Sequence, residues 1–180
     1  MRLAFLLFCV FLTAGCDSSG DDGRVTLGYD GRNVTAPTLG AGSFEGAVRF
    51  TPAVLAEADG LRLVELSIYV LQVPDQATIK VYGPGSAVAP GNLLFSADVT
   101  DQLRAESWNA LAVDGVTIDA GQDLWAAFAY EDDNPSAVIG CDPGPAVQDG
   151  DWVQLPSRPW QPLSVATDLS INWNIRGIAE

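Results

Sequence analysis

Oxygen-bearing side chains are concentrated in one stretch near the C-terminal end of this 180-residue sequence, and they could bind a metal ion. Asp142, Asp149 and Asp151 lie among glycines and prolines that would let backbone carbonyls turn in beside them. Calcium takes about six to eight such oxygens, from carboxylates, carbonyls and water. Aspartates at this density also make turns through side-chain hydrogen bonds to their own backbone. The stretch predicts either a structural Ca²⁺ site or a series of tight turns, and the sequence leaves both open.

Two tryptophans next to this stretch could stack against the rings of a sugar. Trp152 and Trp160 flank the proline-rich connection 156–159, where an indole could face solvent. An indole in such a place can also pin a loop onto the core, because it buries a large apolar area. The other three tryptophans lie inside strand-like patterns and are expected in the core: Trp108, Trp125 and Trp173.

The sequence contains no histidine, which removes the commonest catalytic base and metal ligand. A Ser-His-Asp triad, an imidazole base and most zinc sites are excluded for that reason. A glycosidase would instead need two carboxylates, about 5 Å or about 6.5–9.5 Å apart. We predict no enzymatic activity, and a carboxylate-pair glycoside hydrolase is the weakest alternative. Five glutamates are available for such a pair, none of them in a motif: Glu45, Glu57, Glu65, Glu106 and Glu131.

The beginning of the chain has the composition of a secretory signal. Met1 and Arg2 form a short cationic start, and residues 3–14 are an almost unbroken apolar run. A helix over this run would span about 18 Å, which is too short for a hydrocarbon core of about 30 Å. We therefore expect a signal peptide over residues 1–15 rather than a retained membrane span.

The segment Leu12-Thr13-Ala14-Gly15-Cys16 resembles the lipobox of bacterial lipoproteins. The resemblance implies cleavage before Cys16 and lipidation of its sulfur, with the lipid bilayer as a partner. Residues 16–23 are rich in Gly, Ser and Asp, so we expect them to form a flexible tether. The expected location is the bacterial cell envelope outside the cytoplasm, with inner and outer membrane both left open.

The formal net charge of −14 comes from 9 Lys+Arg against 23 Asp+Glu. A chain this acidic argues against nucleic acid as a partner, because phosphate binding needs clustered basic side chains. Once residues 1–15 are removed and Cys16 is acylated, Cys141 is the remaining thiol and no intrachain disulfide can form. We expect Cys141 to be a small buried side chain, since no histidine is present to activate it.

Residues 24–180 have the pattern of a single all-β domain. Short alternating or apolar runs are separated by Gly, Pro, Asn and Asp, and the clearest alternation places Val64, Leu66, Ile68 and Val70 on one face. About ten strands predict an antiparallel two-sheet β-sandwich, jelly-roll-like, with one short helix over residues 51–58. The strands are expected near residues 24–29, 46–50, 63–73, 78–82, 93–99, 107–113, 123–130, 137–141, 152–155 and 169–178.

A series of landmarks along residues 44–180 resembles a known class of β-sandwich module. In their order they are similar to the adhesin modules of gingipain-type surface proteins of bacteria. The resemblance implies a non-catalytic module that binds glycans, proteins or calcium, or that spaces other domains. The landmarks are AVRFTP (47–52), the long strand 63–73, TIKVY (78–82), WN (108–109), DLW (123–125), CDPGP (141–145) and NWNIRG (172–177).

These features predict a cell-envelope lipoprotein that displays a non-catalytic, adhesin-like recognition domain for a glycan or a protein, with Ca²⁺ as an optional structural stabiliser. The alternative is a structural or assembly subunit of an envelope complex with no small ligand. Exposed Trp152 and Trp160 beside a groove would favour a glycan, and a large exposed apolar patch would favour a protein. Two facing carboxylates in a cleft would favour hydrolysis.

Overall fold

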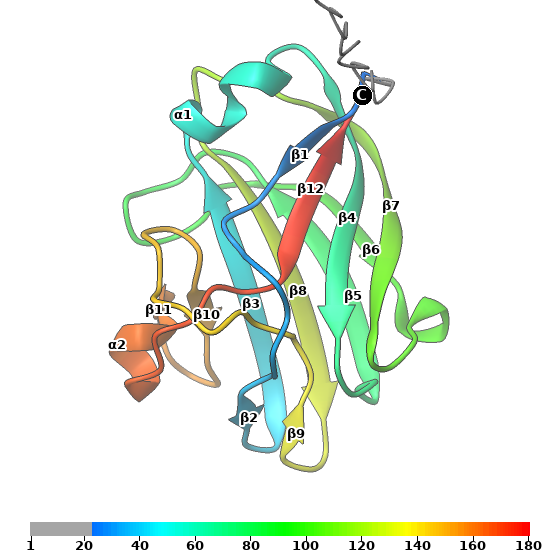
Figure 1. Cartoon of the computed structure of the whole chain (residues 1–180), viewed down its shortest axis with the longest axis vertical. Helices are drawn as coiled ribbons and strands as arrows, with labels where there is room; N and C mark the ends of the chain where they lie inside the picture. Colours follow the sequence, from blue (N-terminus) through cyan, green and yellow to red (C-terminus); the bar gives the residue numbers. More distant parts are fainter. Residues whose placement is uncertain (1–22) are drawn as a thin grey trace, which may run out of the picture.

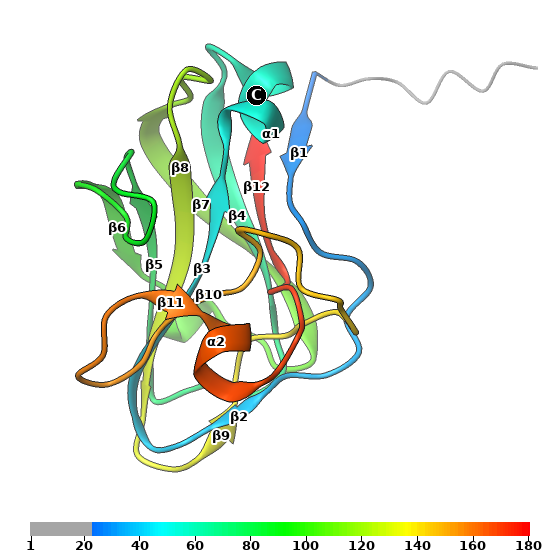
Figure 2. The same cartoon turned by 90° about the vertical axis from the view of Figure 1, so that its left-hand side faces the viewer.

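The structure, a computed structural model, describes residues 23–180, and two β-sheets pack face to face in it (Figure 1, Figure 2). The predicted signal peptide, the lipidation site Cys16 and all of the tether except Gly23 lie outside the described residues. Within residues 23–180, no helix combines the length and the apolar composition needed to cross a bilayer.

The described residues form twelve strands, and every pairing between them is antiparallel. The predicted antiparallel two-sheet β-sandwich is confirmed. One sheet has the order β1-β12-β4-β7, with β1 (Val25–Leu27), β12 (Ile175–Ala179), β4 (Arg62–Val70) and β7 (Ser107–Thr117). The other has the order β11-β10-β3-β8-β5-β6, with β11 (Gln161–Pro162), β10 (Trp152–Gln154), β3 (Gly42–Phe50), β8 (Leu124–Asp132), β5 (Gln76–Tyr82) and β6 (Leu93–Asp98). A small sheet of β2 (Thr38–Leu39) and β9 (Ser136–Ala137) lies at the lower end in Figure 1.

Each of the ten predicted strand segments overlaps a strand of the structure, although segment 137–141 shares only Ala137 with β9 (Ser136–Ala137). The sequence did not predict β2 and β11, which have two residues each and therefore no alternation to recognise. The boundaries differ most in the segment 169–178, where β12 begins only at Ile175 and the preceding residues run as a loop.

The short helix predicted over residues 51–58 is present as α1 (Pro52–Leu55), which continues into the 3-10 turn η1 (Ala56–Ala58). Pro52 occupies the first helical turn, where its missing N–H has no partner to lose. The Thr51 carbonyl accepts the first helical hydrogen bonds, although the Thr51 side chain makes no capping bond. A second short helix, α2 (Leu163–Thr167), follows β11 and was not predicted.

The core lies between the two sheets and follows the alternation of β4. Leu66, Ile68 and Val70 are fully buried there, as predicted. The prediction is wrong for Val64, which lies in a β-bulge where β4 pairs with β12. Glu65 pairs with Ile178 and Leu63 with the next residue, Ala179, so β4 carries one extra residue there. Leu63 is therefore the buried residue at that end of β4, and Val64 is only partly buried.

A second apolar cluster lies on the outer face of the six-stranded sheet, away from the main core. It consists of Ala47, Trp125, Ala127 and Trp152, and Tyr82 and Trp160 pack against it. Trp125 is fully buried although it points out of the sandwich, because the rings of Trp152 and Trp160 lie 5.1 and 6.0 Å from its ring. The connection from β10 to β11 thus covers one end of this outer face.

Candidate functional site

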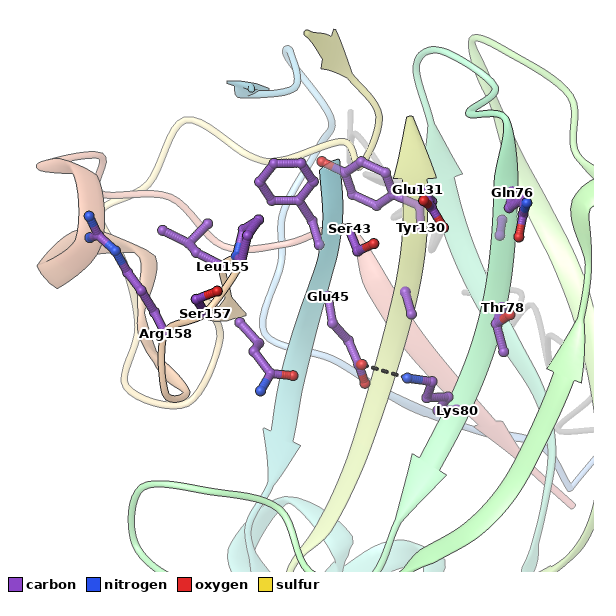
Figure 3. A pocket seen from close by; sticks show the side chains of 15 residues that line it. Ser43, Glu45, Gln76, Thr78, Lys80, Tyr130, Glu131, Leu155, Ser157 and Arg158 are labelled. Atoms are coloured by element: carbon purple, nitrogen blue, oxygen red, sulfur yellow. Dashed lines mark hydrogen bonds and ion pairs between the residues drawn. The ribbon is translucent and has the colours of Figure 1, made fainter. Parts of the chain in front are cut away.

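A groove of about 430 Å³ runs along the outer face of the six-stranded sheet, beside the aromatic cluster. Its floor is built from every second residue of three neighbouring strands, because successive side chains of a strand point to opposite faces. Glu45 of β3 and Thr78 of β5 both pair with Ala129 of β8, so these three residues form one row across the sheet. Figure 3 shows the floor, with the segment 155–158 forming one wall.

The centre of the floor is a hydrogen-bonded ion pair between strands. Lys80 donates from Nζ to Glu45 Oε2 at 2.6 Å, and the Tyr82 hydroxyl donates to Glu45 Oε1 at 2.6 Å. The Glu45 side chain is buried, whereas about a quarter of the Lys80 side chain is exposed. Burial, together with the bond to the Glu45 carboxylate, raises the pKa of Tyr82 well above its usual range. The phenol is therefore a fixed donor, and both carboxylate oxygens of Glu45 are oriented.

One wall of the groove is a tight turn between β10 and β11. Arg158 donates its backbone N–H to the carbonyl of Leu155 at 3.0 Å, which closes the turn. Ser157 at its tip has φ 60°, a left-handed conformation that costs energy for a residue with a side chain. Beyond this turn lies a second hollow of about 420 Å³ that shares Phe44, Leu155, Pro156 and Arg158 with the groove and is completed by residues of β2 and α2.

The two tryptophans predicted to bind a ligand differ in exposure. Trp152 is only 6% exposed, and its indole N–H donates to Asp149 Oδ1 at 3.2 Å. Trp160 is partly exposed and packs on the cluster around Trp125. Neither indole is among the described residues that line the groove. The Nε1 of Trp125 is buried and has no hydrogen-bond partner among residues 23–180.

Asp142, the first predicted calcium ligand, lies in a network of hydrogen bonds. Its oxygens accept bonds from the backbone N–H groups of Gly31, Gly144 and Asn172 at 2.8–3.0 Å, and from Asn172 Nδ2 at 3.0 and 3.2 Å. Burial acts to raise its pKa, but the bonds from Asn172, Gly31 and Gly144 outweigh burial and hold the pKa of Asp142 below its usual range. This carboxylate connects three segments of the chain.

The other two predicted calcium ligands make separate contacts. Asp149 receives the bond from Trp152 and lies 3.5 Å from the Arg49 guanidinium. Asp151 Oδ2 accepts the backbone N–H of Ser164 at 3.0 Å, at the start of α2. Among residues 23–180 no group of three His, Cys, Asp or Glu side chains comes together as a metal site. A calcium site at these positions stays a prediction.

Two of the five candidate glutamates lie in the groove. Glu131 of β8 pairs in register with Ser43, two residues from Glu45 on β3, so the two glutamates are diagonal neighbours on one face. Glu131 is exposed and makes no ion pair with the described residues. The other three lie elsewhere: Glu57 in η1, Glu65 on the outer face of the four-stranded sheet, and Glu106 in the loop before β7.

Sequence reasoning did not single out Lys80, Tyr82 and Arg158 as residues of a site. The alternation of residues 78–82 placed Lys80 and Tyr82 on one outward face, which was the available signal. Cys141 is fully buried, and burial, together with the nearby Asp142 carboxylate, raises its pKa to about 11. A thiol in that state is unreactive, in agreement with the prediction of a small core residue.

Comparison with known proteins supports the fold and goes no further. No family model matches the chain, and no curated protein matches it. Among solved structures it is similar to the clostridial cysteine protease Cwp84 after propeptide cleavage, with a TM-score of 0.58 and 12% sequence identity. The match covers 89% of this chain and 41% of that protein, so the chain spans less than half of its length. The chain is thus an all-β sandwich protein that shares its fold with part of a larger clostridial protein.

Proposed function

We propose that this chain is a non-catalytic recognition protein of the bacterial cell envelope, and that the groove on the six-stranded sheet binds a glycan. The observation that carries the proposal is the Glu45-Lys80-Tyr82 group on the groove floor. Sugar hydroxyls both donate and accept, and this floor offers an oriented carboxylate beside an ammonium group with free N–H donors.

The polar lining of the groove supports a saccharide ligand. Thr78 and Gln154 add a hydroxyl and an amide group in the same row as Glu45, and Gln76 adds an amide group two residues along β5. Polar side chains on the strands of a sheet are held more rigidly than those on loops, which lowers the ordering cost of binding. The partly exposed ring of Trp160 continues this face beyond the groove, where it offers apolar surface for a sugar ring.

The contacts of Glu45 favour binding over hydrolysis. A glycosidase acid or nucleophile needs a carboxylate oxygen that is free to approach the glycosidic bond. Both oxygens of Glu45 instead accept hydrogen bonds, one from Lys80 and one from Tyr82. Release of reducing ends from any bound polysaccharide would contradict this part of the proposal and would make Glu131 the next residue to test.

The test is a thermal melt of the full chain with a panel of polysaccharides. A ligand that binds only the native state at a hundred times its Kd adds about 2.7 kcal/mol, which shifts the melting temperature of a chain this size by roughly 5–10 °C. The Lys80→Met variant removes the ammonium group but keeps the length of the side chain. The polysaccharide should no longer raise the melting temperature of this variant. Arg62→Met, on the other sheet and well exposed, is the matched control. No shift with any polysaccharide would contradict glycan binding.

The proposed location rests on the lipobox-like segment that ends at Cys16. A diacylated cysteine would hold the domain at a membrane surface, since each buried CH₂ contributes about 0.8 kcal/mol and two chains anchor stably. Mass spectrometry of the chain purified from membranes should find fatty acid on Cys16, and the Cys16→Ser variant should be released. A Cys16→Ser variant that stays in the membrane fraction would contradict the lipid anchor.

A protein partner is the second candidate, and the edge strand β6 supports it. β6 lies at the end of the six-stranded sheet, and Leu93 and Leu94 at its start are both about half exposed. Val88, in the loop before β6, is also exposed. Exposed apolar side chains beside the unpaired backbone of an edge strand are a common site of protein contact. Loss of a co-purifying envelope protein in the Leu94→Asp variant, with glycan binding unchanged, would support this alternative.

A further inference from the structure

The pairing of the basic side chains singles out one cation in the groove. Residues 23–180 contain eight basic side chains, and five of them lie within 4.0 Å of a carboxylate: Arg24, Arg49, Arg62, Lys80 and Arg176. The remaining three have no such partner among the described residues: Arg32, Arg104 and Arg158. In a chain with 23 acidic residues, an unpaired cation that lines a groove has capacity left for a ligand.

Arg158 occupies the wall between the two hollows. It lines both of them, together with Leu155 and Pro156, so a ligand that extends from one hollow into the other passes this residue. Figure 3, which draws the lining of the groove, shows Arg158 beside Ser157 and Leu155. Pro156 and Pro159 restrict the backbone on either side, and the strained Ser157 fixes the tip of the turn. Non-glycine residues with positive φ are concentrated at ligand contacts, where the surrounding structure maintains them.

The groove is lined by two carboxylates and two cations, and Arg158 is the cation among them that has no carboxylate partner in residues 23–180. The Glu45 carboxylate and the Lys80 ammonium neutralise each other on the floor. Glu131, on β8, is a pure acceptor and can be satisfied by the hydroxyl groups that every sugar carries. The guanidinium of Arg158 only donates, and its planar fork fits the two oxygens of a carboxylate.

We propose that the groove selects an acidic saccharide, and that Arg158 binds a carboxylate on one of its sugar rings. This inference rests on the proposed glycan function and names the class of ligand. The chain carries a net charge of −14, which repels any polyanion at long range. At physiological ionic strength that repulsion is screened beyond about 8 Å, so the contact at Arg158 decides the preference.

The test uses ligands that differ only in charge. The full chain is titrated with two polyuronates, namely polygalacturonate and alginate, and with the methyl ester of each, in which the carboxylates are neutral. At least one polyuronate should bind about tenfold more tightly than its ester, because one charge-assisted hydrogen bond changes the affinity by about that factor. In Arg158→Ala the affinity for the polyuronate should fall to that for its ester, so that the preference disappears. Arg104→Ala, which removes the same charge outside the groove, should keep the preference.

Each outcome separates this inference from the proposed function. If an ester binds as tightly as its polyuronate, or if only neutral polysaccharides bind, the acidic class is wrong and the glycan function stands. An equal loss of preference in Arg158→Ala and Arg104→Ala would assign the effect to net charge and would overturn the role of Arg158. If no polysaccharide of either kind binds, the proposed function fails, and this inference fails with it. Arg158 is exposed, so its replacement is expected to leave the melting temperature of the free protein unchanged.

Discussion

Charged side chains at the two ends of β10 are used in opposite ways. Before β10, Asp142, Asp149 and Asp151 all bond to donors of the protein itself. After β10, Arg158 projects from a tight turn and has no carboxylate partner among the described residues. A charged group that is buried and fully bonded stabilises the fold, whereas one with unused bonding capacity beside a groove can bind a ligand. The aspartates of the acid-rich stretch, which stand out in the sequence, thus bond within the protein, whereas Arg158 makes no such ion pair within residues 23–180.

The two regions also differ in what supports them. The aspartates connect irregular segments, such as the loop at Gly31 and the one at Asn172, to the stretch before β10. The floor of the groove instead stands on β3, β8 and β5, whose register is regular over most of their length, and only its wall at residues 155–158 is a turn. A loop needs hydrogen bonds from its side chains to keep one conformation, whereas the backbone of a sheet is already fixed by the pairing of its strands. This explains why the polar side chains of the acid-rich loop bond to the protein itself, while those on the sheet are available to a ligand.

Replacement of Asp142 should have the largest effect on stability. In Asp142→Asn, an NH₂ group would face N–H donors of Gly31, Gly144 or Asn172, so buried donors would lose their acceptor. We expect the free energy of unfolding to fall by about 3 kcal/mol, measured by urea denaturation. Asp101→Asn, on the exposed turn η2 (Thr100–Gln102), is the matched control and should change it by less than about 0.5 kcal/mol. A loss below 1 kcal/mol in Asp142→Asn would contradict the structural role.

The same carboxylate should make the fold sensitive to acid. Its pKa is lowered in the folded state, so its contribution is fully present above the unfolded value of about 3.9 and is lost as the pH falls through the folded value. As the pH is lowered from 6 to 2.5, the urea midpoint of the wild type should therefore fall, and that of Asp142→Asn should fall less steeply. Parallel curves for the two proteins would show that other groups cause the loss of stability at low pH.

Replacement of Glu45 should affect binding more than stability. Glu45→Gln removes the charge that orients Lys80, but Lys80 is partly exposed and can turn to solvent. We expect a loss of about 1–2 kcal/mol in stability and at least a tenfold loss in glycan affinity. Urea denaturation and titration calorimetry measure the two effects on the same sample. Glu57→Gln, exposed in η1, is the control. Unchanged affinity in Glu45→Gln would remove the groove floor from the binding site.

Replacement of Tyr82 should have a smaller effect that grows with pH. The folded state raises the pKa of Tyr82, so the stability linked to this phenol is complete below an unfolded pKa of about 10 and is lost above it. Tyr82→Phe should cost about 1 kcal/mol at pH 8, and the difference from the wild type should shrink toward pH 11. Thermal melts across this pH range test it. A difference that stays constant would show that the hydroxyl contributes only by packing.

The sequence predicted the regular part of the fold better than the site. Alternation identified β4 and β5, but it could not show the bulge that moves Leu63 into the core in place of Val64. Composition marked the aspartates, yet the partner of Asp142 is Asn172, thirty residues along the chain, and no local pattern connects the two. The importance of Arg158 depends on which carboxylates reach the other basic side chains, and that is a property of the folded chain.

Removal of calcium should have the smallest effect. Asp142, Asp149 and Asp151 each accept at least one N–H donor of the protein, and among residues 23–180 their side chains do not come together as one group. We therefore expect millimolar Ca²⁺ and chelator to change the melting temperature of the full chain by less than about 1 °C. A rise of several degrees with Ca²⁺, abolished in Asp151→Asn and kept in Asp101→Asn, would establish the predicted calcium site. The two regions would then no longer differ in this respect, because the acid-rich stretch would bind a ligand as well.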